Sequence, residues 1–169
     1  MKFHGALPTA IVLTVAGAHS CHRKVARSDT IEVSLCDLRN QRELFAGKRI
    51  EVKGWVYTDE ERFGLGTNDC GIGLMHSDSP ANRQRDRFNA LVTKTQRGTW
   101  NSDHEVFAIL RGRFHTAPIV KDGQEIWSPG YCCGSSPSVL VIEDVACAVE
   151  APMSSNSMQS AESQCHQPK

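Results

Sequence analysis

The sequence lacks a surplus of either charge and lacks a second long apolar stretch. Its 169 residues include 19 basic and 19 acidic side chains. Nucleic acid and acidic membranes attract proteins through a concentrated basic surface, which a neutral chain does not present in general. Outside the N-terminal segment, no apolar run is long enough to span a bilayer. The length admits one ordinary domain with appendages and excludes two large domains.

Familiar catalytic motifs are also missing. The chain contains no G-x-S-x-G elbow, no G-x-x-x-x-G-K-[ST] phosphate loop and no G-x-G-x-x-G after a strand. His104-Glu105 begins like a zinc-protease helix, but Ala108 stands where the second histidine is needed. Asp59-Glu60-Glu61 is typical of a solvated turn. We therefore predict no catalytic residues. A hydrolytic enzyme of unrecognised type is the alternative, and it requires His76, His115 or the acidic turns to cluster in a cleft.

Residues 1–18 have the features of a secretory signal peptide. Lys2 gives a basic start, an uncharged stretch runs from Ala6 to Ala18, and Ala16-Gly17-Ala18 forms an A-x-A cleavage pattern. Because the stretch is too short for a transmembrane helix and contains Pro8, we expect an exported protein, periplasmic or secreted. Cys21 follows a sequence that partly resembles a bacterial lipoprotein box. A lipid anchor on Cys21 is therefore the alternative to free secretion.

The rest of the chain divides into a lead, a domain and a tail. Residues 19–30 have no hydrophobic period and predict a short extended lead. Residues 151–169 are rich in Ser, Gln, Asn and Pro, and such a segment buries too little surface to offset its ordering entropy. We predict a disordered tail over 151–169 and one domain over 31–150, which is long enough for a single modest core.

Two helices are predicted within the domain. Ser34 has the position of an N-cap for a short helix that ends before Gly47. Ser79-Pro80 opens a second helix, because serine caps well and proline suits the first helical position. This second helix ends before Gly98.

Alternating apolar and polar residues predict the strands. They fall at 48–58, at 105–116 and at 139–149, with two short strands inside 63–76. Asp122-Gly123 predicts the type I′ turn of a hairpin over 119–127. Gly54 and Gly112 interrupt two of the strands, and glycine at such a position typically marks a bulge or sharp bend.

This order of elements has a counterpart among known folds. The segments at 47–56, at 110–114 and at 140–145 (Gly-Lys-Arg-Ile-Glu-Val-Lys-Gly-Trp-Val, Leu-Arg-Gly-Arg-Phe and Leu-Val-Ile-Glu-Asp-Val) resemble small exported bacterial domains of the OB-fold superfamily, at the level of its tRNA-anti-like group. The biochemical role of those domains is mostly unassigned. The resemblance implies a mainly β, five-stranded OB-type barrel with a leading short helix and one helix between strands 3 and 4.

Seven cysteines are many for so short a chain. In an exported protein, cysteines usually form disulfides that stabilise the fold. An OB barrel sets its third and fifth strands side by side, so the resemblance predicts that Cys70 bridges to Cys132 or Cys133. A second bridge between Cys36 and Cys147 would join the leading helix to the last strand. Connectivity is not fixed by sequence alone.

A zinc protein is the alternative use of these cysteines. Cys70, His76, His115, Cys132 and Cys133 offer suitable donors. The chain has no C-x-x-C pair, however, and adjacent cysteines are an awkward chelate. We therefore expect disulfides, with no metal and no cofactor.

One candidate binding face is predicted on the strands. Trp55, Tyr57, Arg111, Arg113 and His115 alternate with the apolar residues and share one side if the first and fourth strands pair. An aromatic and basic face of this kind can hold a protein, a peptide or a saccharide, whereas export and neutral charge disfavour nucleic acid. In the alternative interpretation, the aromatic rings pack under the leading helix and the arginines are solvated. We predict a binding module with an unidentified ligand.

Overall fold

The computed structural model describes residues 29–58, 63–67, 69–78, 82–96, 104–128, 137–152 and 157–167. The predicted signal peptide, most of the predicted lead, Cys21, Cys132 and Cys133 lie outside these residues.

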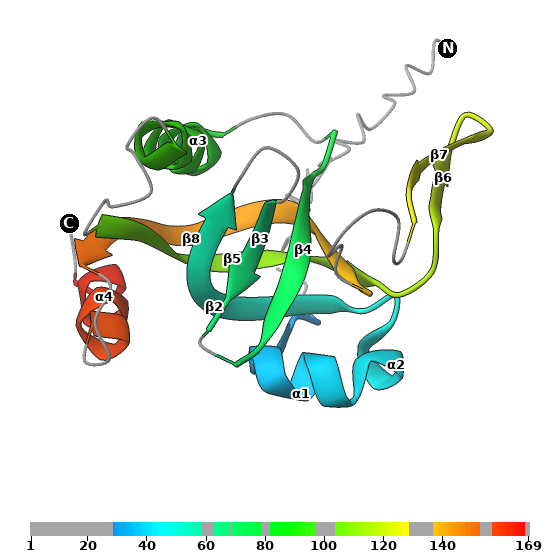
Figure 1. The fold of residues 1–169 in the computed structure, drawn as a ribbon, viewed down its shortest axis with the longest axis horizontal. Coiled ribbons are helices and arrows are strands. Elements are labelled where there is room, and N and C mark those ends of the chain that lie inside the picture. The colour runs from blue at the N-terminus through cyan, green and yellow to red at the C-terminus, as the bar shows by residue number, and fades with distance from the viewer. Residues whose placement is uncertain are drawn as a thin grey trace, which may run out of the picture.

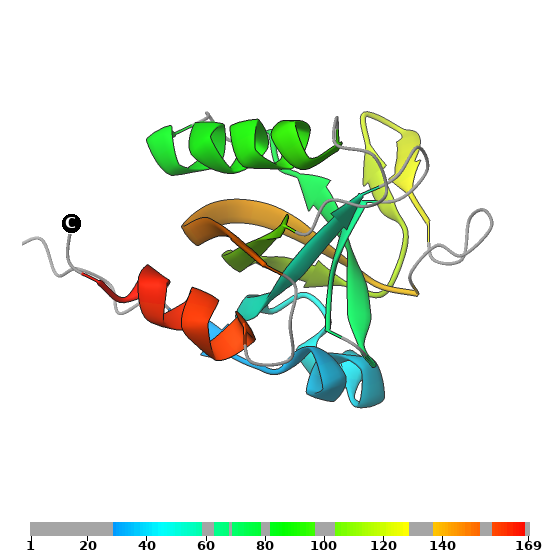
Figure 2. The same ribbon diagram turned by 60° about the vertical axis from the view of Figure 1, so that its left-hand side comes forward.

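The described chain is mainly β, as the sequence predicted. Its elements are β1 (Ile31–Glu32), α1 (Leu35–Asn40), α2 (Arg42–Phe45), β2 (Arg49–Thr58), β3 (Phe63–Gly66), β4 (Gly71–His76), α3 (Arg83–Gln96), β5 (His104–His115), β6 (Ile119–Lys121), β7 (Gln124–Trp127), β8 (Val139–Pro152) and α4 (Ser157–Cys165). Figure 2 shows α3 on one side of the sheet and α1, α2 and α4 on the other.

The strands of the main sheet pair in the order β1-β2-β3-β4-β8-β5, and β2 also pairs with β5 (Figure 1). As a result, β2, β3, β4, β8 and β5 each pair with two or more strands. The pairs β4–β8 and β1–β2 are parallel, and the others are antiparallel. The sequence predicted five strands in this sheet, and the structure adds β1 as a sixth because Ile31 and Glu32 pair with Ile50 and Glu51.

The inward-facing side chains of these strands form the main core. On β2, Ile50 and Val52 are 0% and 1% exposed, and α3 adds Phe88 at 0%. Burying an aliphatic or aromatic side chain of this size contributes about 1.5–3 kcal/mol. The largest side chains of the main core are Leu38, Ile50, Leu65, Ile72, Phe88, Leu110, Phe114, Leu140 and Ile142. Because buried and less buried side chains alternate along much of β2, the core determines which face of this strand points outward.

Local signals in the sequence act where they were predicted. The Ser34 hydroxyl accepts a hydrogen bond from the backbone N–H of Asp37 at 3.1 Å and caps α1. Asp122 and Gly123 have positive φ values of 51° and 77°, as a type I′ turn requires. In α3, the Asn82 side chain accepts a bond from the Arg85 N–H at 2.9 Å and caps the helix. The sequence predicted Ser79, not Asn82, as the cap of this helix; Ser79 and Pro80 lie outside the described residues, and α3 begins at Arg83.

Gly112 lies at an irregularity in the pairing of β5 with β8. The register shifts between Ile109 and Leu110 and again between Arg111 and Gly112. A Cβ atom on Gly112 would overlap the carbonyl oxygen of Val141. The glycine therefore permits a close approach of the two backbones, in agreement with the bulge predicted there.

Both described disulfides differ from the predicted pairs. Cys36 joins Cys70, with 5.2 Å between their Cα atoms, and Cys147 joins Cys165, with 5.7 Å. The bridge predicted from Cys70 to Cys132 or Cys133, and the bridge predicted from Cys36 to Cys147, are therefore wrong. The physical reason is the placement of α1 against the start of β4, which brings Cys36 directly to Cys70.

The C-terminal segment is more ordered than the sequence predicted. Instead of a disordered tail from residue 151, β8 continues to Pro152 and α4 forms over Ser157–Cys165. Contacts with the sheet account for this helix. The disulfide Cys147–Cys165 joins it to β8, and Ala161, at 0% exposure, packs on the outer face of the sheet.

Candidate binding face and groove

The outer face of the β2–β5 pair carries most of the predicted binding residues. The register pairs Trp55 with Phe107, Lys53 with Ile109, Glu51 with Arg111, and Arg49 with Arg113. Directly paired residues of antiparallel strands point to the same side. These four cross-strand pairs therefore form one continuous row on the sheet, here called the outer strip. It is apolar at the Trp55–Phe107 end and ionic at the Arg49–Arg113 end.

Trp55 lies at the apolar end and is buried. Its indole meets the Phe107 ring edge to face, with ring centroids 5.5 Å apart and an interplanar angle of 71°. Trp55 is 7% exposed, Phe107 is 0% exposed, and both pack with Ile109 and with Ala161 of α4. The tryptophan is therefore covered by the C-terminal helix, whereas the alternative sequence interpretation placed such rings under the leading helix.

The arginines at the other end are compensated by carboxylates. The Arg111 Nε atom pairs with Glu51, and its Nη1 atom lies 3.3 Å from Asp144. Arg113 donates from Nη1 to the carbonyl oxygen of Gly47 at 2.8 Å, and its Nε atom lies 3.9 Å from Glu143. Exposed pairs of this kind add little stability, but they lower the positive potential of the face. The face is ionic and not strongly basic.

Tyr57 lies outside this strip, over neighbouring strands. It is 40% exposed, and its hydroxyl donates to the carbonyl oxygen of Ile72 at 3.4 Å. The ring lies across two glycines of β3 and one of β4: a Cβ on Gly64 would overlap it, and one on Gly66 would lie 3.2 Å from Cε1. Beside the ring is a shallow hollow of about 320 Å³. The glycines thus make room for the tyrosine.

His76 and His115 are the last residues of β4 and β5. His115, at the end of β5, pairs with Val139, and burial followed by the charge of Arg113 lowers its pKa. His76 stacks on Phe63 with ring centroids 5.1 Å apart, and burial lowers its pKa as well. Among the described residues, no group of three or more His, Cys, Asp or Glu side chains has the arrangement of a metal site.

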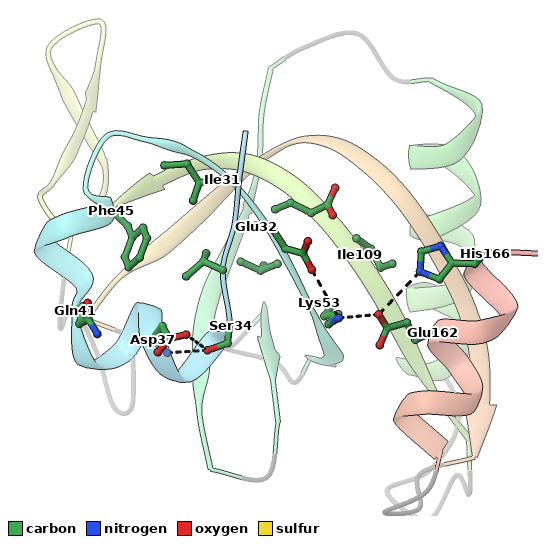
Figure 3. Close-up of a pocket in the computed structure, with 13 residues that line it drawn as sticks. Ile31, Glu32, Ser34, Asp37, Gln41, Phe45, Lys53, Ile109, Glu162 and His166 are labelled. Carbon is green, nitrogen blue, oxygen red and sulfur yellow. Dashed lines mark hydrogen bonds and ion pairs between the residues drawn. The ribbon is translucent and has the colours of Figure 1, made fainter. Parts of the chain in front are cut away.

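A groove of about 840 Å³ opens beside β1, and Figure 3 shows its lining. On one side it is bounded by β1, α1 and α2, on the other by α4, and its floor comes from β2 and β5. The apolar lining consists of Ile31, Val33, Phe45, Val52 and Ile109, and the polar lining of Glu32, Ser34, Asp37, Gln41, Glu51, Lys53, Glu162 and His166.

Carboxylates outnumber cations in this groove. Lys53 Nζ lies 2.7 Å from Glu162 and 3.8 Å from Glu32. The hydrogen bond with Glu162 is the main cause that raises the pKa of Lys53, and burial opposes it. The lining holds one lysine and four carboxylates, those of Glu32, Asp37, Glu51 and Glu162, of which Glu51 pairs with Arg111 outside the lining. The lining therefore has a net negative charge at neutral pH.

The backbone of β1 adds an open edge. The N–H of Val33 donates to the carbonyl oxygen of Glu51 at 3.0 Å, so this residue faces β2. Successive residues of a strand alternate in direction, and the N–H and C=O of Glu32 consequently point away from β2. In the described part of the chain, β1 pairs with β2 alone.

The sequence found only part of this site. Lys53 belongs to the same alternating row as Trp55 and Tyr57, so its outward direction was predictable. The wall formed by Glu162 and His166 was not, because α4 was expected to be disordered.

Comparisons of the chain with protein-family models, with curated proteins and with solved structures give no match. None of the helices in the described ranges is both long and apolar enough to cross a membrane. The two disulfides indicate an oxidising, extracytoplasmic environment.

Proposed function

We propose that this chain is an exported, OB-type binding module that takes an extended, basic peptide segment of a protein partner into the groove beside β1. The OB-type barrel would consist of β2, β3, β4, β5 and β8. Three observations support this assignment: the additional β2–β5 pairing, the parallel pairing of the third and fifth of these strands, and the position of α3 between the third and the fourth.

The groove is the observation that carries the proposal. Its volume, about 840 Å³, is within the range of ligand sites, and Ile31 and Glu32 of β1 belong to its lining. A peptide that adds to the edge of β1 can form main-chain hydrogen bonds with Glu32, whose N–H and C=O point away from β2. Ile109 and Phe45 offer apolar contacts, and the excess of carboxylates favours lysine or arginine in the segment.

The charges on this surface also favour a basic peptide over nucleic acid. A phosphate backbone needs uncompensated basic side chains. On the outer strip, Arg111 and Arg113 pair with acidic residues, and the groove itself is acidic. A polyanion is therefore repelled where a basic peptide is attracted.

Fluorescence anisotropy of two matched probes tests the proposal. The first probe is a fluorescein-labelled hexapeptide of alternating valine and lysine, and the second replaces each lysine by glutamate. We expect the basic probe to bind more tightly, and added salt to weaken its binding. Glu32→Gln should weaken it about two- to fivefold, since an exposed charge pair is worth up to about 1 kcal/mol.

Glu125→Gln is the matched control. Glu125 is an exposed glutamate on β7 and does not line the groove. This variant should bind the basic probe like the unmodified protein. Equal affinity for the two probes, or equal effects of the two substitutions, would contradict binding in the groove.

A further inference from the structure

The helix α4 covers the large side chains at the apolar end of the outer strip. Trp55, Phe107 and Ile109 are 7%, 0% and 8% exposed beneath it. Residues on the outer face of a sheet are ordinarily solvated, whereas here the strip has the composition of an interaction surface, with two aromatic rings in contact. Residues of α4 and of β8 pack together on these side chains, and Figure 1 shows α4 beside the end of β8.

The helix α4 buries few large side chains. The helix has nine residues, and helices shorter than about 12 residues are marginal in isolation. Ala161 is fully buried, and Met158 is partly buried on the same cluster. Glu162 adds the ion pair with Lys53. The disulfide to Cys147 of β8 joins the helix covalently to the sheet, and both of its cysteines are partly exposed.

The second disulfide provides a contrast. Cys70 is 8% exposed and belongs to the main core, and Cys36 packs against that core. Cys36 is itself partly exposed, so Cys36–Cys70 offers a thiol reagent one accessible cysteine, whereas Cys147–Cys165 offers two.

We propose that α4 is a removable cover, and that reduction of Cys147–Cys165 exposes the strip Trp55–Phe107–Ile109 to an amphipathic helix of a partner protein. The reductant is a dithiol, such as the active site of an exported thiol oxidoreductase. Its two thiols become a disulfide, while Cys147 and Cys165 each gain one hydrogen as the bond between them breaks. This inference goes beyond binding in the groove, because it concerns the surface beneath α4, although the two sites share Lys53 and Ile109 and α4 forms one wall of the groove.

The contacts of α4 define the chemistry of that partner. A small residue takes the place of Ala161 against the rings, and an apolar residue three positions earlier takes the place of Met158. A carboxylate next to the small residue pairs with Lys53, as Glu162 does. The partner is therefore a helix with a narrow apolar stripe and an acidic flank, bound in a helix-in-groove mode.

The experiment uses the full chain and a variant that imitates reduction of one bridge. In Cys147→Ser/Cys165→Ser the bridge Cys36–Cys70 stays intact. We expect hydrogen exchange of the α4 amides to become about tenfold faster or more, while β2 and β5 keep their protection. The retained protection of these strands shows that the variant folds. Selective reduction of the unmodified chain, followed by alkylation and mass analysis, provides a second preparation in the same state.

Binding is measured with a helical peptide. The probe has the sequence of Ser157–Gln167 with Cys165 replaced by serine and the exposed positions replaced by alanine, which favours helix. We expect it to bind the opened protein about tenfold or more tightly than the oxidised protein, which its own tethered helix blocks. A matched probe with lysine in place of Glu162 should bind more weakly, because it repels Lys53.

Three results would overturn the proposal. The first is unchanged exchange of α4 after loss of the bridge. The second is an open α4 without binding of the probe, and the third is equal binding of the probe to both redox states. Cys36→Ser/Cys70→Ser serves as the control, because it removes a bridge without releasing α4 and should leave the probe excluded.

Discussion

The helices α1 and α4 are both joined to the sheet by a disulfide, yet they are stabilised differently. α1 has only six residues, but it places Leu35 and Leu38, 3% and 0% exposed, in the main core, and Ser34 caps it. α4 is longer, but Ala161 is its only fully buried side chain among the described residues. In α1 the disulfide reinforces a helix that the core already holds. In α4 the disulfide joins to the sheet a helix that buries no large side chain among the described residues.

Truncation of a buried residue in each helix should show the largest difference. Leu38→Ala removes three heavy atoms of side chain from the main core and should lower the free energy of unfolding by about 2–5 kcal/mol. Ala161→Gly removes one methyl group from the outer cluster and adds backbone freedom, which costs about 1 kcal/mol. Urea titrations measure both values. A loss for Ala161→Gly as large as that for Leu38→Ala would place α4 within the cooperative core.

Removal of each disulfide sharpens the comparison. The bridges span 34 and 18 residues, and loop closure alone predicts losses of about 4 and about 3 kcal/mol. For Cys147→Ser/Cys165→Ser we expect a smaller loss than this in global unfolding. The folded protein also gains freedom when α4 opens, and that gain offsets part of the effect on the unfolded chain. Thermal unfolding of both double variants tests this, and a larger loss at the α4 bridge would contradict it.

The difference between the helices also explains what the sequence could predict. The strands, the Ser34 cap and the Asp122-Gly123 turn follow from local patterns, and the structure confirms them. Alternation likewise placed Trp55 and Arg111 on the outer face, although it did not indicate that one would be covered and the other paired. These outcomes depend on contacts between distant segments.

The α4 helix was missed for the same reason. Its sequence has few large apolar residues, so hydrophobic periodicity gives no helical signal. Its position depends on a disulfide to Cys147 and on Lys53, which lies 109 residues away in the chain from Glu162. The groove was missed with it, since α4 forms one wall. A pairing between cysteines is a property of the folded arrangement and is not encoded in their spacing.

The smallest effect concerns the ion pair that links α4 to β2. The hydrogen bond with Glu162 raises the pKa of Lys53, so the charged amine is favoured in the folded state. A raised lysine pKa contributes stability that is fully present below the unfolded value of 10.5 and is lost as the pH rises through the folded value. Between pH 6 and 9 the stabilisation contributed by the Lys53–Glu162 pair should therefore stay constant. The attachment of α4 should weaken only in more alkaline solution.

Lys53→Gln tests this contribution, with Lys121→Gln as its matched control. Lys121 is also an exposed lysine in an ion pair, but its partner is Asp78, away from α4. Labelling the tryptophans with fluorine lets NMR follow Trp55 as the pH rises. We expect its signal to shift only above pH 10.5 in the unmodified protein and in Lys121→Gln, and this shift to be absent in Lys53→Gln. The Cys36–Cys70 bridge and α1 have no such group, so their amide protection should not change in the same pH range. A parallel loss of protection in both helices would mean that alkaline pH unfolds the whole domain, and that α4 is no less firmly held than α1.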